Sequence, residues 1–472
     1  MRRAIQAGRS GPAGRGFVLL LVLVVVMLAS MVAVSLMFLL GAEKTASATG
    51  WEGEQAWAVA LTGLERAMQV ARRSAREEAI WRDNPAEFRD QLVQEDGLQR
   101  WLFTVYSPGD DESGWVRFGL TDEASKLNIL RSSSAMLEAL SDMRLEGGGG
   151  WSGVSSAPAA GEEGAGAGSQ SGTATNGLAG GDLPWSCADE YLQSSGASWL
   201  AWCGEDANFN GRLDANENDG ETQWPPDNQD SRLDRGLRQD LTVHSYDVNQ
   251  DGSGQPRIRL NDPQADWASA GLPASVGDYV AAMRRSGQSI EHPAALLEAE
   301  GTFPAARGAG QETVRSGVGK DELPALLDRC TGSDQERLEG LINVNTAPAA
   351  VLRTLPGIDE AMAEAIVARR SNLSQEDRRT IAWLYQEGLM NADQFKQVAP
   401  LLTTRSLQFH CYVAGFNQPG RRHRILEAIF DVASETPRVL FLRDVTRSGL
   451  PPTLVGEESE TMAWSSGGGG SR

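Results

Sequence analysis

Oxygen-bearing side chains recur at alternate positions across residues 206–217, a spacing that suits a calcium ion. The segment fits the twelve-residue pattern D-x-[DN]-x-[DN]-G-x5-E in full, with Gly211 at the sharp turn and Leu213 as the apolar anchor. Calcium takes six to eight oxygen ligands. The alternative is an acidic, Asn-rich surface turn that holds no metal. The predicted ligands, including one backbone carbonyl, are Asp206, Asn208, Asn210, Arg212, Asp214 and Glu217.

A second and less complete match to the same pattern begins at Asp247. Its twelfth position is Ile258, which cannot bind a metal, although Asn261 or Asp262 could substitute from downstream. A polar turn between two strands is the alternative here. We therefore expect one or two structural calcium ions, bound at about 10⁻⁴–10⁻³ M as in extracellular modules. The predicted ligands of this weaker site are Asp247, Asn249, Asp251 and Ser253.

Other reactive residues give little sign of catalysis. The sequence contains no G-x-S-x-G, P-loop or H-E-x-x-H motif, and its four histidines are scattered. Four cysteines without a C-x-x-C pair argue against a zinc ribbon. Cys187 and Cys203 lie close in sequence and could form a disulfide in an oxidising compartment, although four cysteines allow three full pairings. We expect no enzymatic activity. The histidines are His244, His292, His410 and His423.

Charge and length narrow the possible functions. The chain has 472 residues, enough for two or three domains. It carries 43 Lys and Arg against 63 Asp and Glu, for a net charge of −20. Because nucleic acids are held by a basic surface, this balance argues against nucleic acid as the main partner.

The amino terminus combines a basic leader with a long apolar run. Residues 1–16 contain four arginines and no acid, and residues 17–40 are interrupted only by Ser30 and Ser35. About 20 helical residues cross the hydrocarbon core of a membrane. The arginines precede the run, so the rest of the chain is expected outside the cytoplasm. A cleavable secretory signal would have a shorter apolar region, of about 7–15 residues.

The segments after the apolar run are expected to position these sites. Residues 51–82 read as a helix, and residues 101–106 and 115–120 read as two strands joined by a turn. Three further strands from residue 406 onward could return to the sheet begun near residue 101. Residues 147–182 are rich in Gly, Ala and Ser and read as a linker. The apolar stripe predicted for the helix is Trp57, Leu61, Leu64, Met68 and Ala71.

Residues 341–370 read as two helices joined by a hairpin at Pro356-Gly357-Ile358, with Thr346 as the expected N-cap of the first helix. Such hairpins commonly hold duplex DNA through backbone N–H groups. Here three arginines are balanced by three acids, so the module carries no net charge. We therefore expect it to pack against protein and not to bind nucleic acid. The balancing residues are Arg353, Arg369 and Arg370 against Asp359, Glu360 and Glu364.

The boundary between leader and apolar run resembles the prepilin peptidase site of pilins and pseudopilins, which are cleaved after a Gly. The matching residues are Arg15, Gly16 and Phe17. A plain signal anchor is the alternative. Most pilin-like proteins carry Glu five residues into the mature chain, where this sequence has Leu21. A carboxylate in hydrocarbon is costly unless it is paired, so Leu suits a tip subunit that has no neighbour ahead of it.

Two further segments extend the resemblance, one at residues 122–128 (Asp-Glu-Ala-Ser-Lys-Leu-Asn) and one at residues 343–348 (Asn-Val-Asn-Thr-Ala-Pro). With the leader and Leu21, they make the chain similar to the general secretion pathway protein K family, the largest minor pseudopilin of type II secretion. The resemblance implies an α+β, pilin-like fold, with a long N-terminal transmembrane helix and an antiparallel sheet. It also implies a large, mainly helical inserted domain that binds calcium and contains the helix-hairpin-helix (SAM-like) module.

The expected division of the chain follows from these segments. It is a leader (1–16), a transmembrane helix (17–40), a pilin-like helix with the first strands (41–130), a linker (131–182), an acidic calcium-binding part of the insertion (183–340), the helix-hairpin-helix module (341–402), the last strands (403–450) and a tail (451–472).

The resemblance also implies a function. The protein would be processed between Gly16 and Phe17, methylated, and held in the inner membrane by a single span with a large periplasmic domain. It would lie at the tip of the pseudopilus, initiate fibre assembly and support export of folded proteins across the outer membrane. Its partners would be the other minor pseudopilins, the major pseudopilin, prepilin peptidase and secreted cargo. Two alternatives remain, a minor pilin of a type IV pilus and a signal-anchored, calcium-dependent adhesive ectodomain.

Overall fold

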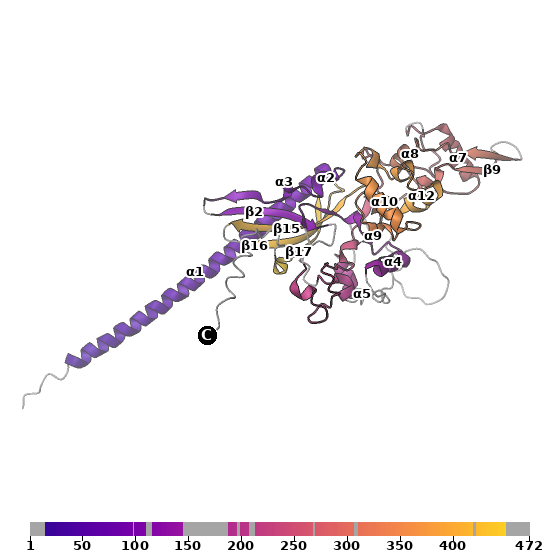
Figure 1. Cartoon of the computed structure of the whole chain (residues 1–472). Coiled ribbons are helices and arrows are strands. Elements are labelled where there is room, and N and C mark those ends of the chain that lie inside the picture. The colour runs from indigo at the N-terminus through magenta and orange to yellow at the C-terminus, as the bar shows by residue number, and fades with distance from the viewer. Residues whose placement is uncertain are drawn as a thin grey trace, which may run out of the picture.

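The computed structural model combines a long helix, an antiparallel sheet and a large insertion (Figure 1). The fold is therefore mixed α and β, as expected. The residues that it describes are 15–97, 99–109, 116–144, 187–195, 199–206, 213–267, 270–305, 310–418 and 422–449. The linker predicted at 147–182 and the tail from 451 lie outside these residues.

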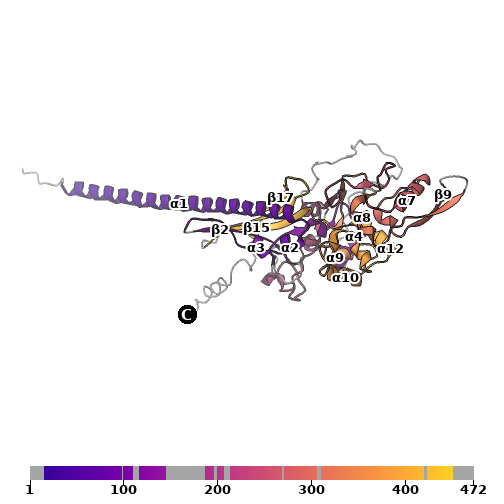
Figure 2. The ribbon, with the colours of Figure 1, turned by 90° about the horizontal axis from the view of Figure 1, so that it is seen from above.

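Helix α1 (Arg15–Ser74) runs for 60 residues without a break and projects from the rest of the protein as a rod (Figure 2). Its Leu20–Lys44 part is exposed, apolar and long enough to cross a membrane, with a mean hydropathy of 2.9. At 1.5 Å per residue, these 25 residues span about 37 Å, more than the ~30 Å hydrocarbon core. The sequence-based expectation of one N-terminal helix capable of spanning is confirmed.

The central sheet combines strands from the N-terminal and C-terminal parts of the chain. Its strand order is β1-β2-β15-β16-β17, and every neighbouring pair is antiparallel. Val105 in β2 lies opposite Val413 in β15. The predicted return of the C-terminal strands to the first strands is therefore confirmed. The strand predicted at 115–120 is too long, because the structure has only β3 (Val116–Arg117) there, paired with β2. The main strands are β1 (Gln91–Glu95), β2 (Arg100–Pro108), β15 (Gln408–Gln418), β16 (His423–Asp431) and β17 (Arg438–Asp444), and β4 (Thr121–Asp122) pairs with β15.

The second half of α1 packs on one face of this sheet, and we call this contact the helix seam. Two glycines set how closely helix and sheet approach. A Cβ at Gly415 would lie 2.3 Å from the Ala56 carbonyl oxygen, and one at Gly63 would lie 2.6 Å from the Val413 side chain. The buried residues of α1 at the helix seam are Ala56, Val59, Ala60, Leu64, Ala67, Met68, Val70 and Ala71.

The stripe predicted for this helix is therefore only partly right. Leu64, Met68 and Ala71 are buried, whereas Trp57 and Leu61 are half-buried at the edge of the seam. The centre of the buried face is made of smaller residues, because only small side chains allow the helix backbone to come this close to the strands.

The insertion occupies the chain between β4 and β15 and has its own apolar core, which includes Trp383 and Phe395. Figure 1 places it at the end of the sheet away from the apolar part of α1. Residues 134–144 correct one expectation. They were predicted to belong to a linker, but they form helix α4 (Ser134–Arg144) and bury Leu137 and Leu140 in this core.

The insertion is built from short elements. Its α-helices after α4 are α5 (Ala188–Ser195), α6 (Trp199–Cys203), α7 (Ala274–Arg285), α8 (Leu323–Arg329), α9 (Ala349–Leu352), α10 (Glu360–Arg370), α11 (Trp383–Gln386) and α12 (Ala392–Val398). Its 3-10 helices are η1 (Glu123–Ser125), η2 (Ala215–Glu217), η3 (Arg238–Asp240), η4 (Pro293–Leu296), η5 (Asp377–Arg379) and η6 (Ala399–Leu401). Outside the insertion lie α2 (Glu78–Trp81), α3 (Pro85–Phe88) and η7 (Thr446–Ser448).

The strands of the insertion form two-stranded pairs among the described residues. Three pairs are parallel: β5 (Leu127–Asn128) with β6 (Leu241–Thr242), β8 (Ile258–Arg259) with β11 (Cys330–Thr331), and β13 (Ile342–Asn343) with β14 (Leu402–Thr403). Two pairs are antiparallel: β7 (Tyr246–Val248) with β12 (Arg337–Glu339), and β9 (Glu300–Pro304) with β10 (Gln311–Arg315).

Candidate functional site

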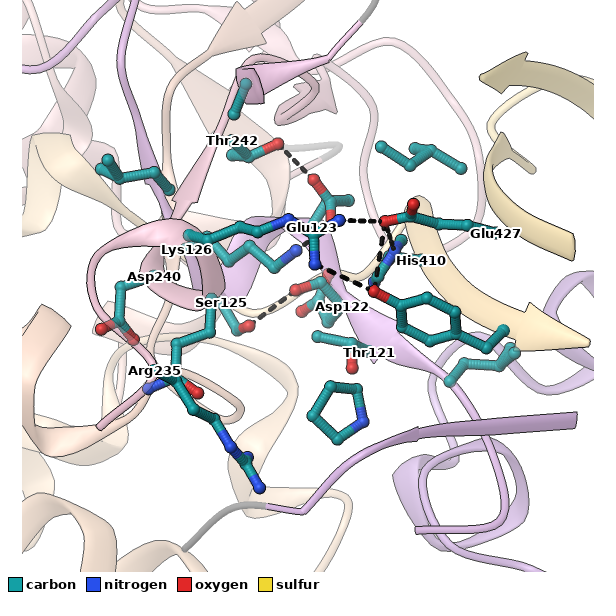
Figure 3. A pocket seen from close by; sticks show the side chains of 18 of the residues that line it. Thr121, Asp122, Glu123, Ser125, Lys126, Arg235, Asp240, Thr242, His410 and Glu427 are labelled. Atoms are coloured by element: carbon teal, nitrogen blue, oxygen red, sulfur yellow. Dashed lines mark hydrogen bonds and ion pairs between the residues drawn. The ribbon is translucent and has the colours of Figure 1, made fainter. Parts of the chain in front are cut away.

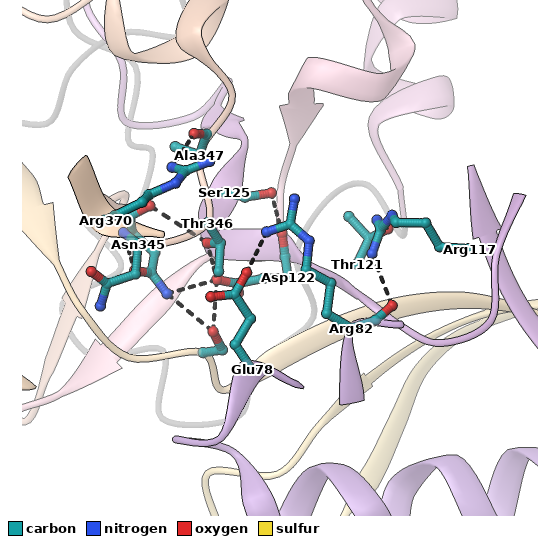
Figure 4. Close-up of polar contacts among 12 residues, drawn as sticks. Glu78, Arg82, Arg117, Thr121, Asp122, Ser125, Asn345, Thr346, Ala347 and Arg370 are labelled. Carbon is teal, nitrogen blue, oxygen red and sulfur yellow. Dashed lines mark hydrogen bonds and ion pairs between the residues drawn. The ribbon is translucent and has the colours of Figure 1, made fainter. Parts of the chain in front are cut away.

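A cluster of buried polar side chains joins the insertion to the sheet, and it centres on Asp122. This carboxylate is 2% exposed, at the point where the chain leaves β4 for the insertion. Its Oδ2 accepts hydrogen bonds from Asn343 Nδ2 (2.8 Å), Thr346 Oγ1 (2.7 Å) and Ser406 Oγ (2.7 Å). Figure 4 shows Asp122 beside Thr346. Its Oδ1 accepts from the backbone N–H of Ala124 (3.0 Å) and so begins η1.

These bonds bring together the two segments on which the family resemblance rests, residues 122–128 and 343–348. They also tie the start of the insertion to its end, because Ser406 lies two residues before β15. Burial raises the pKa of Asp122 to about 6, although the four donors act in the opposite direction. In the sequence, Asp122 was visible only as part of a family-like segment, and the structure adds both its capping of η1 and these long-range bonds.

Glu123 forms the second part of the cluster and is 1% exposed (Figure 3). Lys126 Nζ lies 2.5 Å from Glu123 Oε1, and the Thr242 hydroxyl donates to Glu123 Oε2. Burial alone would raise the pKa of Glu123, but the charge of Lys126 and the hydrogen bonds from Lys126 and Thr242 act against it and the pKa is lowered. Thr242 belongs to β6, so this pair fastens a distant segment of the insertion to residues 122–128.

Glu427 of β16 forms the third part, on the sheet face opposite the helix seam. Its Oε1 accepts from Arg238 Nη2 (2.6 Å) and lies 3.0 Å from His410 Nε2, while its Oε2 pairs with Arg443 Nη2 (2.5 Å). Both arginines also reach Asp189 of α5, at 3.1 and 2.9 Å. Although burial opposes ionisation, Arg238 and His410 hold the pKa of Glu427 well below its usual value.

We call the side chains around Asp122, Glu123 and Glu427 the polar junction. A cavity of about 430 Å³ lies beside it and is lined by residues of the sheet and of the insertion. Hydrogen-bond donors and cations from the sheet and from the insertion together hold the three carboxylates. What this arrangement does most directly is fix the orientation of the insertion on the sheet.

The first predicted calcium loop is described in part. Asn208, Asn210 and Arg212 lie outside the described residues. Asp206 and Glu217 are both buried, at 6% and 1% exposure, and Glu217 Oε2 accepts from the backbone N–H of Asp214 (2.9 Å).

The pKa of the neighbouring Cys203 thiol is affected by the negative charge at this loop. Burial raises the pKa of Cys203 to about 12, and the charges of Asp206, Asp234 and Glu217 add to the effect. Asp234 is an acid that the motif did not identify. Buried carboxylates suit a cation, although no group of three or more His, Cys, Asp or Glu among the described residues is arranged to hold a metal ion. Calcium at this loop stays a prediction.

The second predicted loop is fully described, and the protein engages its side chains in part, since Asp247 Oδ1 and Asn249 Oδ1 accept no hydrogen bond from the described residues. Asp247 Oδ1 pairs with Arg405 Nη2 at 2.6 Å, and its Oδ2 accepts from Thr403 Oγ1 at 2.8 Å. Asp251 Oδ1 accepts from both the backbone N–H and the hydroxyl of Ser253, at 2.8 and 2.7 Å. Asn249 Nδ2 donates to two backbone carbonyls of residues 333 and 335. A guanidinium thus supplies positive charge beside Asp247, and calcium at this loop also remains untested.

The cysteines do not form the disulfide that was considered from the sequence. All four are free and buried, so the bond between Cys187 and Cys203 is not formed in this structure. Burial raises the pKa of both thiols. Because disulfides form through the thiolate, this environment disfavours the reaction.

The helix-hairpin-helix module matches its sequence signature in most respects. Gly357 has a φ of +75° at the hairpin, and Asp359 caps α10 by accepting from the Met362 N–H. The prediction that Thr346 caps the first helix is wrong, since Pro348 occupies the N-cap of α9 and the Thr346 hydroxyl bonds to Asp122.

The three arginines of this module are engaged within the protein. Arg370 is 8% exposed and donates to the carbonyls of Val344 (3.1 Å) and Ala347 (2.6 Å). Arg369 pairs with Glu387, and Arg353 lies 3.5 Å from Glu360.

The remaining predicted site residues lie at the start of α1. Gly16 and Phe17 belong to its first turn, and the Leu21 side chain is 55% exposed on the apolar rod.

Comparison with known proteins identifies one motif. Residues 339–403 match a helix-hairpin-helix motif, in agreement with the module expected at 341–402. No curated protein sequence matches the chain.

Proposed function

We propose that this protein is a minor pseudopilin of the general secretion pathway protein K type, placed at the tip of a type II secretion pseudopilus. The observation that carries the proposal is the continuity of α1, which passes from an exposed apolar rod to a buried seam on an antiparallel sheet without interruption. This combination of a long apolar helix and an antiparallel sheet supports the pilin-like fold that the family resemblance implies.

The arrangement suits a subunit that starts a fibre. The apolar half of α1 has no packing partner within the described chain, so neighbouring helices could pack along it during assembly. The insertion lies at the opposite end of the sheet (Figures 1 and 2), where it would obstruct a further subunit above it. A subunit with this shape would cap the fibre and present the insertion to the secretion channel or to cargo.

In this role the protein would be held in the inner membrane by one span, with the sheet and insertion in the periplasm. Prepilin peptidase would cleave between Gly16 and Phe17, and the other pseudopilins would be its partners. Calcium at the first loop would stabilise the insertion. The internal engagement of Arg353, Arg369 and Arg370 supports a packing role for the helix-hairpin-helix module over nucleic-acid binding.

The mature amino terminus tests the proposal. Protein purified from its native membrane should begin at Phe17, with a methylated amine, by intact-mass and terminal-peptide mass spectrometry. Gly16→Val should retain the leader, whereas the matched change Gly14→Val should not. An unprocessed leader on protein from cells with working secretion would contradict the proposal and favour the signal-anchored adhesive ectodomain.

The partners distinguish the two filament systems. Mild detergent extraction after cross-linking should recover the small pilin-like subunits of type II secretion together with this chain. Recovery of type IV pilus subunits in their place would favour the minor pilin.

A further inference from the structure

A second, larger cavity lies between the end of α1 and the insertion. Its volume is about 1070 Å³, and described residues of both parts line it. Arginines line it from several elements, including Arg76 after α1, Arg329 at the end of α8 and Arg378 of η5. Together with Arg257 and Arg405, these residues define what we call the arginine groove.

The arginines of the groove differ in whether a carboxylate neutralises their charge. Arg405 pairs with Asp247 at 2.6 Å, and Arg378 pairs with Glu78 at 3.1 Å. Arg257 has no carboxylate within ion-pair distance among the described residues. Its Nε donates to the Asp328 carbonyl oxygen (3.0 Å), and its terminal nitrogens have no described partner. A partly buried guanidinium without a counter-ion is unfavourable, because charge removed from water needs compensation.

The acids nearest to Arg257 already have other partners. Asp247 is paired with Arg405, and Asp328 Oδ1 accepts from the backbone N–H of Gly252 (2.8 Å). Burial and the charge of Arg405 lower the pKa of Arg257 in spite of these acids. Seven of the described lining residues are acids, against eight arginines, so the excess of positive charge is confined to the free end of the Arg257 side chain.

His292 lines the same groove and supplies a neutral donor. Its Nδ1 accepts from the backbone N–H of Ala294 (3.2 Å), so the proton of the neutral ring lies on Nε2. Burial and the charge of Arg257 lower the pKa of His292 to about 4, so the ring is neutral near pH 7.

We propose that the arginine groove binds a carboxylate of an acidic polypeptide segment, with Arg257 as the main contact and His292 Nε2–H as a second donor. The planar guanidinium fork matches a carboxylate with two parallel hydrogen bonds. The groove is much larger than a small oxyanion and has room for several residues of an extended chain. The inference concerns a ligand site and stands independently of the filament role.

Fluorescence anisotropy with a labelled Glu-Glu-Glu-Glu peptide and the full chain in detergent tests the proposal. Arg257→Gln should weaken binding at least about tenfold, as expected when a charge-assisted pair is lost. The matched control is Arg259→Gln, two residues along the chain, whose side chain is 56% exposed and lies 3.6 Å from Asp334. The control should bind like the unchanged protein, and a Gln-Gln-Gln-Gln peptide should not bind.

A second measurement covers the case in which Arg257→Gln fails to fold by circular dichroism. His292→Ala should then weaken binding severalfold, and inorganic phosphate should displace the peptide from the unchanged protein. Equal binding by the Arg257 and Arg259 variants, equal binding of the Gln peptide, or no saturable binding would overturn the proposal. Phosphate binding without peptide binding would overturn the assignment to a polypeptide.

Discussion

The two faces of β15 meet different neighbours by different means. Phe409, Cys411 and Val413 point to α1 and belong to the helix seam, while His410 and Tyr412 point to the insertion and the polar junction. Strand alternation thus separates an apolar contact from a charged one within a few residues. The helix seam depends on shape, because glycines and alanines set the distance between α1 and the sheet. The polar junction depends on hydrogen-bond donors and charges.

This difference predicts different responses to change. An apolar contact with little free space tolerates no added atoms but is insensitive to pH. A buried polar cluster tolerates neither the loss of one member nor a shift in protonation, since the remaining members are left unsatisfied. Each prediction below tests one side of that contrast.

The largest effect is expected at the helix seam. Gly415→Val would place side-chain atoms against the backbone of Ala56 and Ala60, which cannot move aside without separating α1 from the sheet. We expect a loss of at least about 4 kcal/mol in the free energy of unfolding, measured by urea denaturation. Gly310→Val is the matched control, because none of the described residues has an atom within 4 Å of its Cβ position. Similar stability of the two variants would contradict the close approach at the seam.

Removal of one member of the polar junction comes next. Glu427→Ala would remove one of the two carboxylates that Arg238 and Arg443 share, the other being Asp189, at a cost of about 3 kcal/mol in the same assay. The exposed pair between Arg369 and Glu387 gives the control, since Glu387→Ala should cost less than about 1 kcal/mol. Equal losses would show that burial does not distinguish these pairs.

Protonation of Asp122 should make the polar junction dependent on pH. Its pKa of about 6 lies above the unfolded value of about 3.8, so the folded chain keeps a proton that the unfolded chain loses between these values. Its contribution to stability is therefore present at low pH and is lost as pH rises to about 6. From pH 4 to pH 7 this amounts to about 2 kcal/mol.

The variant Asp122→Asn removes that titration. The difference in unfolding free energy between the unchanged protein and Asp122→Asn should change by about 2 kcal/mol between pH 4 and pH 7, whatever the other groups contribute. Gly415→Ala, which alters only the helix seam, should show no such pH dependence. A constant difference for Asp122→Asn would mean that Asp122 has an ordinary pKa.

Calcium is expected to have the smallest effect and to act on the side of the insertion. At 5 mM, a site with a dissociation constant of about 10⁻⁴–10⁻³ M adds roughly 1–2 kcal/mol and raises the melting temperature. Glu217→Gln should reduce the shift, whereas the exposed control Glu221→Gln should not. Hydrogen exchange should slow in the insertion and stay unchanged at the helix seam. A melting curve that is the same with calcium and with chelator would reject both predicted loops.

The helix seam was more predictable from the sequence than the polar junction. Alternation in β2 and β15 and the length of the apolar run are local patterns, and both identified elements that the structure contains. The helix stripe was misplaced because Trp57 and Leu61 are more apolar than the alanines and glycine that a close approach requires. Helix α4 was missed because it was grouped with the Gly- and Ser-rich segment that follows it, although it contains no glycine and Met136, Leu137 and Leu140 have a helical spacing.

The polar junction depends on contacts that no local pattern reveals. Asp122 meets Asn343 and Ser406 across more than 200 residues of sequence. Thr346 fits the rule for a helix N-cap, yet its hydroxyl is used by a distant carboxylate. The presence of Asp122 and Thr346 in two family-like segments was visible in the sequence, but their pairing follows only from the path of the chain.

The neighbouring position of β2 and β15 constrains how the protein is made. β2 ends at Pro108 and β15 begins at Gln408, so a ribosome adding about 5–20 residues per second leaves β2 without this partner for on the order of 15–60 s. During that interval the hydrophobic edge of the early hairpin is open to aggregation. Maturation of the sheet must therefore wait for nearly the whole polypeptide to be synthesised, and a nascent chain truncated before β15 would need a chaperone to remain soluble.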